Sequence, residues 1–148
     1  MTKGWGRILA IDPGDRRIGI ALSDPTGTIA NPLTVIRHVS RQVDAALIAQ
    51  IANEHDAVMI IIGQALDSFG LPGASGRKAA RLAEIVRTQT SIPVVLWDES
   101  GSTQTARAAA AALGSKRKRA RSHLDELAAT VILQSYLDQR SYSSLNEE

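Results

Sequence analysis

The chain has 148 residues, 44% of them hydrophobic and 22% charged, which suits one globular domain with a hydrophobic core. It has no cysteine, which excludes a disulfide framework, a thiolate zinc site and a cysteine nucleophile. Aromatic residues make up only 3%, which disfavours a broad stacking surface for single-stranded bases. The start lacks a secretory signal, and the most apolar run, 57–62, is too short to cross a bilayer, so we expect a soluble cytoplasmic protein without a membrane partner.

Three short strands are predicted at the start of the chain. The first spans residues 7–12 and ends at Asp12, directly before a Pro-Gly turn. The second spans 18–23, and the third spans 28–36 with an interruption near Pro32. Because their connections are short, these strands are predicted to form an antiparallel meander.

Helices and buried strands are predicted to alternate over the rest of the chain. The first of these helices should bury a face made of Val43, Leu47 and Ile51. Both later strands are rich in β-branched residues, which is typical of strands that are buried. The predicted elements are helix 40–54, strand 57–62, helix 77–88, strand 93–97, helix 102–113 and helix 124–139.

This order of elements predicts an α/β fold. A meander followed by two right-handed crossovers gives a mixed five-stranded sheet, three strands antiparallel and two parallel, with helices on its faces. We expect a single domain over residues 1–140 and a flexible C-terminal tail over residues 141–148.

Carboxylates stand at the ends of several predicted elements. Asp12 ends a strand at the centre of the sheet, and Asp98 and Glu99 follow the last strand, at the edge where open α/β sheets place ligands. Asp125 opens the final helix on an apolar face, so its carboxylate is predicted to need a partner. Purely structural roles are also open, because Asp initiates turns and acids favour helix N-termini.

A divalent metal would give these separate carboxylates one function. Mg²⁺ and Mn²⁺ bind oxygen ligands, and two-metal phosphodiesterases hold their ions about 3.5–4 Å apart. Such ions activate the attacking water and stabilise the leaving oxygen without help from histidine or cysteine. His38, His55 and His123 lack metal-ligand spacing; the first two are interpreted as solvated or capping residues, and the third as a possible phosphate neighbour.

Positive charge is concentrated in one segment, predicted to be a loop. Without that segment the chain carries 12 Lys and Arg against 15 Asp and Glu, a net charge of −3. A basic segment on a mildly acidic body is either a solvated loop or a phosphate-binding edge. Its basic residues are Lys116, Arg117, Lys118, Arg119 and Arg121.

Three ordered motifs resemble the YqgF family. The sequence ILAIDPGDRRIGIALSD at 8–24 is similar to the opening motif of that family. The resemblance continues through VVLWDE at 94–99 and LDELAA at 124–129, and it covers residues 7–138 in all. The family has been assigned to Holliday junction resolution and to the maturation of pre-16S ribosomal RNA.

The resemblance implies a ribonuclease-H-like fold and a metal-dependent nuclease. It carries the catalytic and metal-binding carboxylates onto Asp12, Glu99 and Asp125, the residues already selected by their positions. It also implies an Mg²⁺ or Mn²⁺ cofactor, RNA or DNA as substrate, and pre-ribosomal particles as possible partners. A monomer and a homodimer both stay open.

The turn after the first strand supplies further substrate-binding candidates. Gly14 would let a phosphate approach the backbone closely, and Arg16 or Arg17 would hold a flanking phosphate. Two departures from the family border this region. Ser100 stands where many relatives have Arg after the Asp-Glu pair, and 63–65 read Gly-Gln-Ala in place of Gly-Leu-Pro.

Two other functions are kept as alternatives. A nucleic-acid-binding ribosome-assembly module with little or no catalysis is favoured by the missing Arg and disfavoured by the intact carboxylates. A nucleotide-binding protein of the actin-like or sugar-kinase type shares an Asp-x-Gly pattern, but those enzymes need two lobes and this chain is too short for a pair.

Overall fold

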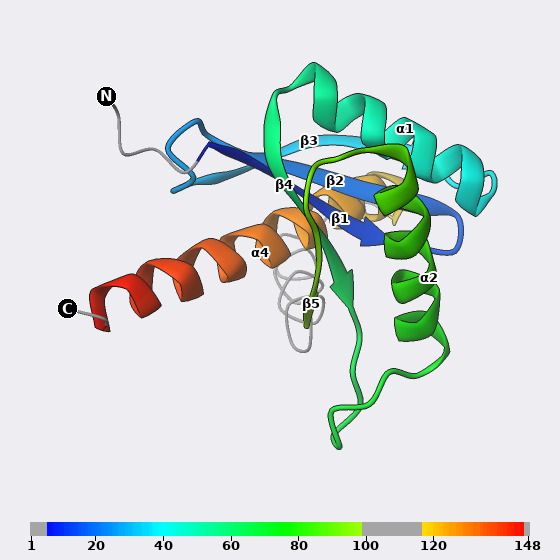
Figure 1. The fold of residues 1–148 in the computed structure, drawn as a ribbon. Coiled ribbons are helices and arrows are strands. Elements are labelled where there is room, and N and C mark those ends of the chain that lie inside the picture. The colour runs from blue at the N-terminus through cyan, green and yellow to red at the C-terminus, as the bar shows by residue number, and fades with distance from the viewer. Residues whose placement is uncertain (1–5, 99–116, 147–148) are drawn as a thin grey trace.

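A five-stranded mixed sheet forms the centre of the molecule (Figure 1). This computed structural model describes the backbone of residues 6–98 and 117–146, and the side chains of residues 6–98 and 127–141. The order across the sheet is β3-β2-β1-β4-β5, as predicted for the α/β fold. The strands are β1 (Arg7–Pro13), β2 (Arg17–Ser23), β3 (Ala30–Arg37), β4 (Ala57–Gln64) and β5 (Val94–Asp98).

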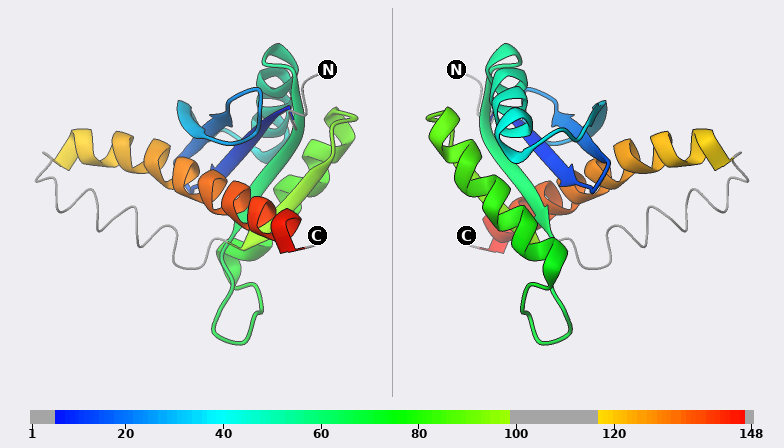
Figure 2. Two further views of the ribbon diagram at one scale, coloured as in Figure 1. Left: turned by 90° about the vertical axis from the view of Figure 1, so that its left-hand side faces the viewer. Right: turned by 90° about the vertical axis from the view of Figure 1, so that its right-hand side faces the viewer.

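Helices cover both faces of this sheet (Figure 2). β1, β2 and β3 pair antiparallel, whereas β1–β4 and β4–β5 are parallel. The crossover through α1 joins β3 to β4, and the crossover through α2 joins β4 to β5. Those two helices pack in the hydrophobic cluster on one face, and α4 packs in the cluster on the other. The helices are α1 (Arg41–Glu54), α2 (Ala74–Gln89) and α4 (Arg117–Asn146).

The central strand shows how side chains divide between the two faces. Leu9 and Ile11 of β1 pack with α1 and α2, while Ile8 and Ala10 pack with α4. All four are fully buried. Because successive side chains of a strand point to opposite faces, this alternation explains why β1 reads as a continuous apolar run.

The interruption predicted at Pro32 is present as a β-bulge. Ile20 pairs with Thr34 and Ala21 with Pro32, which leaves Leu33 as the extra residue on β3. Proline cannot donate a ladder hydrogen bond, so its place on an edge strand beside a bulge is expected.

The predicted face of α1 is wrong in part. Val43 is 48% exposed, and the buried residues of the helix are Asp44, Ala45, Ile48, Ala49, Ile51 and Ala52. The helix packs against α2 and β4, and three of its buried residues are small alanines, which a hydrophobic pattern weights little. A buried carboxylate, Asp44, also lies on that face.

The last strand is also less buried than predicted. β5 is an edge strand, with β4 as its only neighbour in the described sheet. Val94 is buried, whereas Val95 and Asp98 are exposed. Within β4, Val58 is exposed although the apolar run predicted a strand covered on both faces.

The last helix is longer than the predicted 124–139. Its backbone is helical from Arg117 to Asn146, so residues 117–121 of the segment expected to be a basic loop and residues 141–146 of the expected tail are helical. The sequence from 115 to 146 has neither glycine nor proline, and nothing in it stops the helix. The helix predicted over 102–113 lies outside the described residues. Among the described helices, none is both long and apolar enough to cross a membrane.

Candidate metal and nucleic-acid site

Asp12 lies near the carboxyl end of β1 and is half-buried. It pairs with Gly19 of β2. Asp12 continues the alternation of Ile8 and Ala10, so its side chain belongs to the face of the sheet that α4 covers. Ala129 of α4 packs in the same cluster as those two residues. The chain therefore places this carboxylate on the α4 face.

The other two predicted carboxylates are only partly placed. Glu99 and the side chain of Asp125 lie outside the described residues. The backbone of Asp125 is in α4, four residues before the buried Ala129. No group of three His, Cys, Asp or Glu residues that could hold a metal is found within the described part of the chain. That finding does not bear on the proposed triad, because two of its members fall outside that part.

The carboxyl ends of the parallel strands meet at one edge of the sheet. Trp97 pairs with Gly63 of β4, and Ile11 pairs with the residue before it, Ile62. Asp12 and Trp97 thus lie about 10 Å apart across two strand spacings. Trp97 therefore lies level with Asp12 in the sheet, and it precedes Glu99 by two residues in the chain.

An aromatic contact fixes α4 against this edge. The rings of Trp97 and Tyr136 meet edge to face at 5.2 Å and 89°. The Tyr136 hydroxyl donates to the Met59 sulfur at 3.2 Å, which ties the helix to β4 as well. The Trp97 ring is therefore held on the same face of the sheet as Asp12.

The turn between β1 and β2 carries the other predicted binding residues. A Cβ on Gly14 would come within 2.3 Å of the Arg17 carbonyl oxygen. The hairpin itself therefore requires glycine at this position, whether or not a phosphate approaches it. Arg16 is exposed and Arg17 is half-buried.

Both arginines line an open groove of about 480 Å³, which we call the arginine groove: Arg16, Arg17, Val35, Ile36 and Arg37. Arg17 and Arg37 are cross-strand partners of β2 and β3. The sequence analysis did not select Arg37. Arg37 could have been selected from the register of the predicted meander, because that register places the end of the third strand beside the start of the second.

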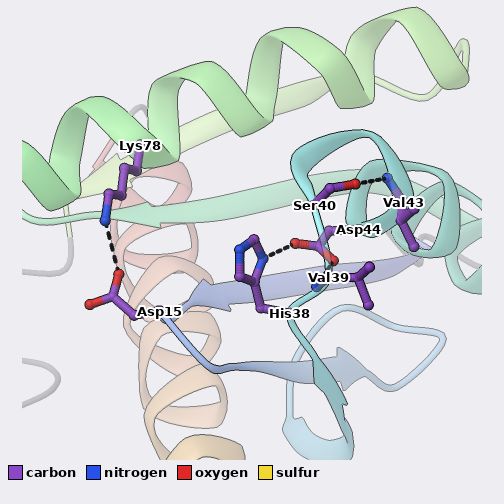
Figure 3. A network of polar contacts seen from close by, with 7 residues as sticks. All are labelled: Asp15, His38, Val39, Ser40, Val43, Asp44 and Lys78. Carbon is purple, nitrogen blue, oxygen red and sulfur yellow. Dashed lines mark hydrogen bonds and ion pairs between the residues drawn. The ribbon is translucent and has the colours of Figure 1, made fainter.

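A second, more enclosed cavity lies beyond the same turn. We call it the α1–α2 pocket; it measures about 250 Å³ and is lined in part by Asp15, His38, Arg41, Asp44, Lys78 and Leu82. Its acids are paired with basic side chains (Figure 3). Lys78 Nζ donates to Asp15 at 3.1 Å, and His38 Nδ1 contacts the Asp44 carboxylate.

Asp44 is the buried centre of that pocket. Its side chain also accepts a hydrogen bond from the Val39 backbone N–H at 3.0 Å, and only 3% of the residue is exposed. His38 is thus the partner of a buried acid, which the sequence did not reveal. His55 was interpreted correctly as a capping residue, since its Nδ1 lies 2.9 Å from the Ile51 carbonyl oxygen at the end of α1.

The departure from the family after β4 forms an ordered loop. The Asp67 carboxylate accepts the backbone N–H groups of Phe69 at 2.8 Å and Leu71 at 3.0 Å. A β-bridge between Leu66 and Pro72 closes the loop. The other departure, at Ser100, lies outside the described residues.

Comparison with solved structures defines the fold class first. RuvC of T. thermophilus in complex with a Holliday junction substrate matches with a TM-score of 0.59 at 12% identity, covering 93% of this chain and 96% of that one. Fowlpox virus resolvase with substrate Holliday junction DNA matches with a TM-score of 0.54 at 13% identity, covering 90% and 97%. At these identities the likeness concerns the fold alone, which is ribonuclease-H-like, as predicted.

The sequence then defines the family. Residues 6–139 match the RuvX family model, described as Holliday junction resolvase, and the chain belongs to that family. A protein of Thermoanaerobacter pseudethanolicus is 41% identical over 133 residues, covering 89% of this chain and 96% of the relative. One of Caldanaerobacter subterraneus is 37% identical over 138 residues, covering 93% and 99%. Both carry the name "Putative pre-16S rRNA nuclease". The predicted class of enzyme, a nuclease, is confirmed at this level.

Proposed function

We propose that this chain is a metal-dependent nuclease that hydrolyses phosphodiester bonds, either in the 5′-end processing of pre-16S rRNA or in the resolution of branched DNA. One observation carries the proposal. In a chain of the RuvX family, Asp12 lies half-buried near the end of the central strand, on the face that α4 covers. A carboxylate in that position is suited to a metal that a substrate can also reach.

Asp12, Glu99 and Asp125 are the residues proposed to hold Mg²⁺ or Mn²⁺. Oxygen-only ligands suit these hard cations, and the chain offers no cysteine as a competing ligand. The strand register supports the grouping, because Trp97 lies two strands from Asp12 and precedes Glu99 by two residues. Asp125 lies on the helix that covers the same face. When bound, the metal would supply a Lewis acid and lower the pKa of water.

The protein's own residues have three tasks in this proposal. Asp12 fixes the metal position from the rigid centre of the sheet, where its backbone pairs with Gly19. Gly14 and the arginines at 16 and 17 receive a phosphate next to the scissile one. The basic residues of 116–121 add sequence-independent attraction for the nucleic-acid backbone.

The names of the relatives favour ribosomal RNA as the substrate. The two relatives named above are aligned over nearly their whole length and carry a pre-16S rRNA nuclease name. The family description favours a four-way DNA junction. A cytoplasmic location, a pre-ribosomal particle as partner and the oligomeric state stay predictions.

Cleavage assays would test the proposal. Purified protein is incubated with precursor 16S rRNA, single strands and four-way junctions, each with Mg²⁺, with Mn²⁺ and with EDTA. We expect metal-dependent cleavage of at least one substrate and none by Asp12→Asn. Tight binding without cleavage by the wild type, in either metal, would instead favour the non-catalytic ribosome-assembly module.

A further inference from the structure

We infer that the arginine groove is a second binding site for the substrate, in which Arg37 together with Arg16 and Arg17 holds backbone phosphates beside the scissile one. The inference rests on the proposed function for the position of the cleaved bond. It adds Arg37, a residue that no sequence motif singled out, and it names the ligand as the phosphodiester backbone of a nucleic-acid strand.

The first argument is the position of the groove on the sheet. Asp12 pairs with Gly19, and Gly19 pairs with Val35, so these three residues form one row across β1, β2 and β3. Arg17 and Arg37 form the next row on the same face, two residues from Gly19 and Val35 towards the β1–β2 turn. That step is about 7 Å, which an extended arginine side chain can largely span. The Arg17–Arg37 pair of the groove is thus adjacent to Asp12 and on its side of the sheet.

The second argument is charge. Arg17 and Arg37 are directly opposite one another in an antiparallel pair, which brings two arginines into one row of the sheet. The described residues that line the groove contribute three positive charges and no negative one. A backbone phosphate suits such a lining, because the planar fork of arginine can bind a phosphate in a bidentate manner.

The third argument is that the backbone holds the groove in place. Arg17 and Arg37 belong to the β2–β3 ladder, and the His38 backbone N–H donates to the Arg16 carbonyl oxygen at 2.9 Å. The three arginines therefore project from positions that are fixed before a ligand arrives. Groups that are held in advance lose less freedom on binding than groups on a flexible loop.

Binding measurements with a charge-matched control test the site. Affinity for a labelled single-stranded RNA, and for DNA of the same sequence, is measured in EDTA over a series of salt concentrations. Arg37→Gln should bind several-fold more weakly, with the slope of log affinity against log salt reduced by about 0.7 for each phosphate that the variant no longer neutralises. Arg81→Gln removes the same charge from the exposed surface of α2, which covers the opposite face, and should keep the wild-type slope.

Two further measurements separate phosphate binding from other causes. Arg37→Lys should keep the slope, because it keeps the charge, and the thermal midpoint of Arg37→Gln should be nearly unchanged because Arg37 is exposed. RNA and DNA should lose affinity equally. An unchanged slope in Arg37→Gln, an equal loss in Arg81→Gln, or a loss confined to RNA would each overturn the assignment.

A separate experiment tests whether the arginine groove lies next to the cleaved bond. The chain has no cysteine, so Arg37→Cys can carry a single photo-cross-linker. Cross-links should cluster within a few nucleotides of the cleaved bond, whereas cross-links from Arg81→Cys should not. Scattered cross-links from both residues would contradict the proposed placement of Arg37 next to the cleaved bond. If the wild type never cleaves, the proposed function fails, while the salt slopes still decide whether the groove binds phosphate.

Discussion

The arginine groove and the α1–α2 pocket lie on either side of the same turn, yet they differ in how positive charge is arranged. In the pocket, Lys78 is paired with Asp15, and His38 with the buried Asp44. In the groove, the described lining places arginine opposite arginine. The pocket therefore balances acids and bases within its own walls, while the described residues that line the groove carry positive charge only. The number of basic residues near a site is thus a poorer indicator of its net charge than whether acidic residues lie opposite them.

The two sites should also differ in what they contribute to stability. The Lys78–Asp15 pair is exposed, at 57% and 83% for the two side chains, so it contributes about 1 kcal/mol or less. Asp44 is buried and holds both His38 and the Val39 backbone, so it should matter to folding. Mutations on the α4 face should instead change activity and binding.

The largest expected effect is on catalysis and comes from Asp12→Asn. Loss of a metal-bridging carboxylate should remove several kcal/mol of transition-state stabilisation, or a rate loss on the order of 1,000-fold or more. The thermal midpoint should stay the same or rise slightly, because the change removes one charge, at similar volume, from the proposed cluster of carboxylates. Cleavage rate and calorimetry on one preparation check both. A near wild-type rate would remove Asp12 from the site.

The next effect concerns the basic segment at 116–121. Changing its five basic residues to Gln should weaken every nucleic acid about equally and reduce the salt slope by a few units, at roughly 0.7–0.9 per neutralised phosphate. Arg37→Gln alone should give a smaller reduction. Salt titrations of the two variants and their combination would show whether the effects add. An unchanged slope for the five-residue variant would leave this segment as a solvated surface.

Mutations in the α1–α2 pocket should instead change the free energy of unfolding. Asp44→Ala leaves the Val39 N–H and the His38 ring without their buried acceptor, which should cost about 1–3 kcal/mol of unfolding free energy. Urea unfolding measures it, with Asp44→Asn as the control that retains an acceptor oxygen. The affinity for nucleic acid should not change. A strong loss of affinity in a folded Asp44→Ala protein would contradict the division between the two sites.

The smallest effect should be at Asp24, in the turn between β2 and β3. The Ile29 backbone N–H, the Thr26 hydroxyl and the Thr28 backbone N–H hold the pKa of Asp24 well below its ordinary value. Its contribution to stability is therefore present at neutral pH and is lost as the pH falls below about 4 towards the lowered pKa. Asp24→Asn should lower the thermal midpoint slightly at pH 7, and the difference should shrink on acidification. A difference that grows with falling pH would contradict this assignment.

The sequence predicted the sheet well because its pattern was simple. A continuous apolar run followed by an acid and a Pro-Gly turn predicts a central strand ending at Asp12, and the structure has that strand. The bulge at Pro32 was likewise predictable, since proline cannot pair within a central ladder.

Features set by long-range contacts were not predictable in the same way. The buried face of α1 includes Asp44, whose carboxylate contacts the His38 ring just after β3. A hydrophobic pattern cannot predict that a charged residue is buried. The exposure of Val95 depends on which strand lies at the edge of the sheet. Arg37 becomes informative only through its cross-strand partner. The roles of Glu99 and Asp125 stay predictions.

The unbroken backbone of α4 has a mechanical consequence. Thirty helical residues make a rod about 45 Å long, fixed by Tyr136 against β4 and β5 and by Ala129 against the middle of the sheet. The basic residues from Arg117 onward sit on the arm beyond that second support. Because the helical backbone is continuous, we expect the arm to move with the part of α4 that packs on the sheet, so a small tilt at Ala129 would displace the end of the arm the most. We expect such a tilt to move the basic residues of the arm while the sheet that carries Asp12 stays in place.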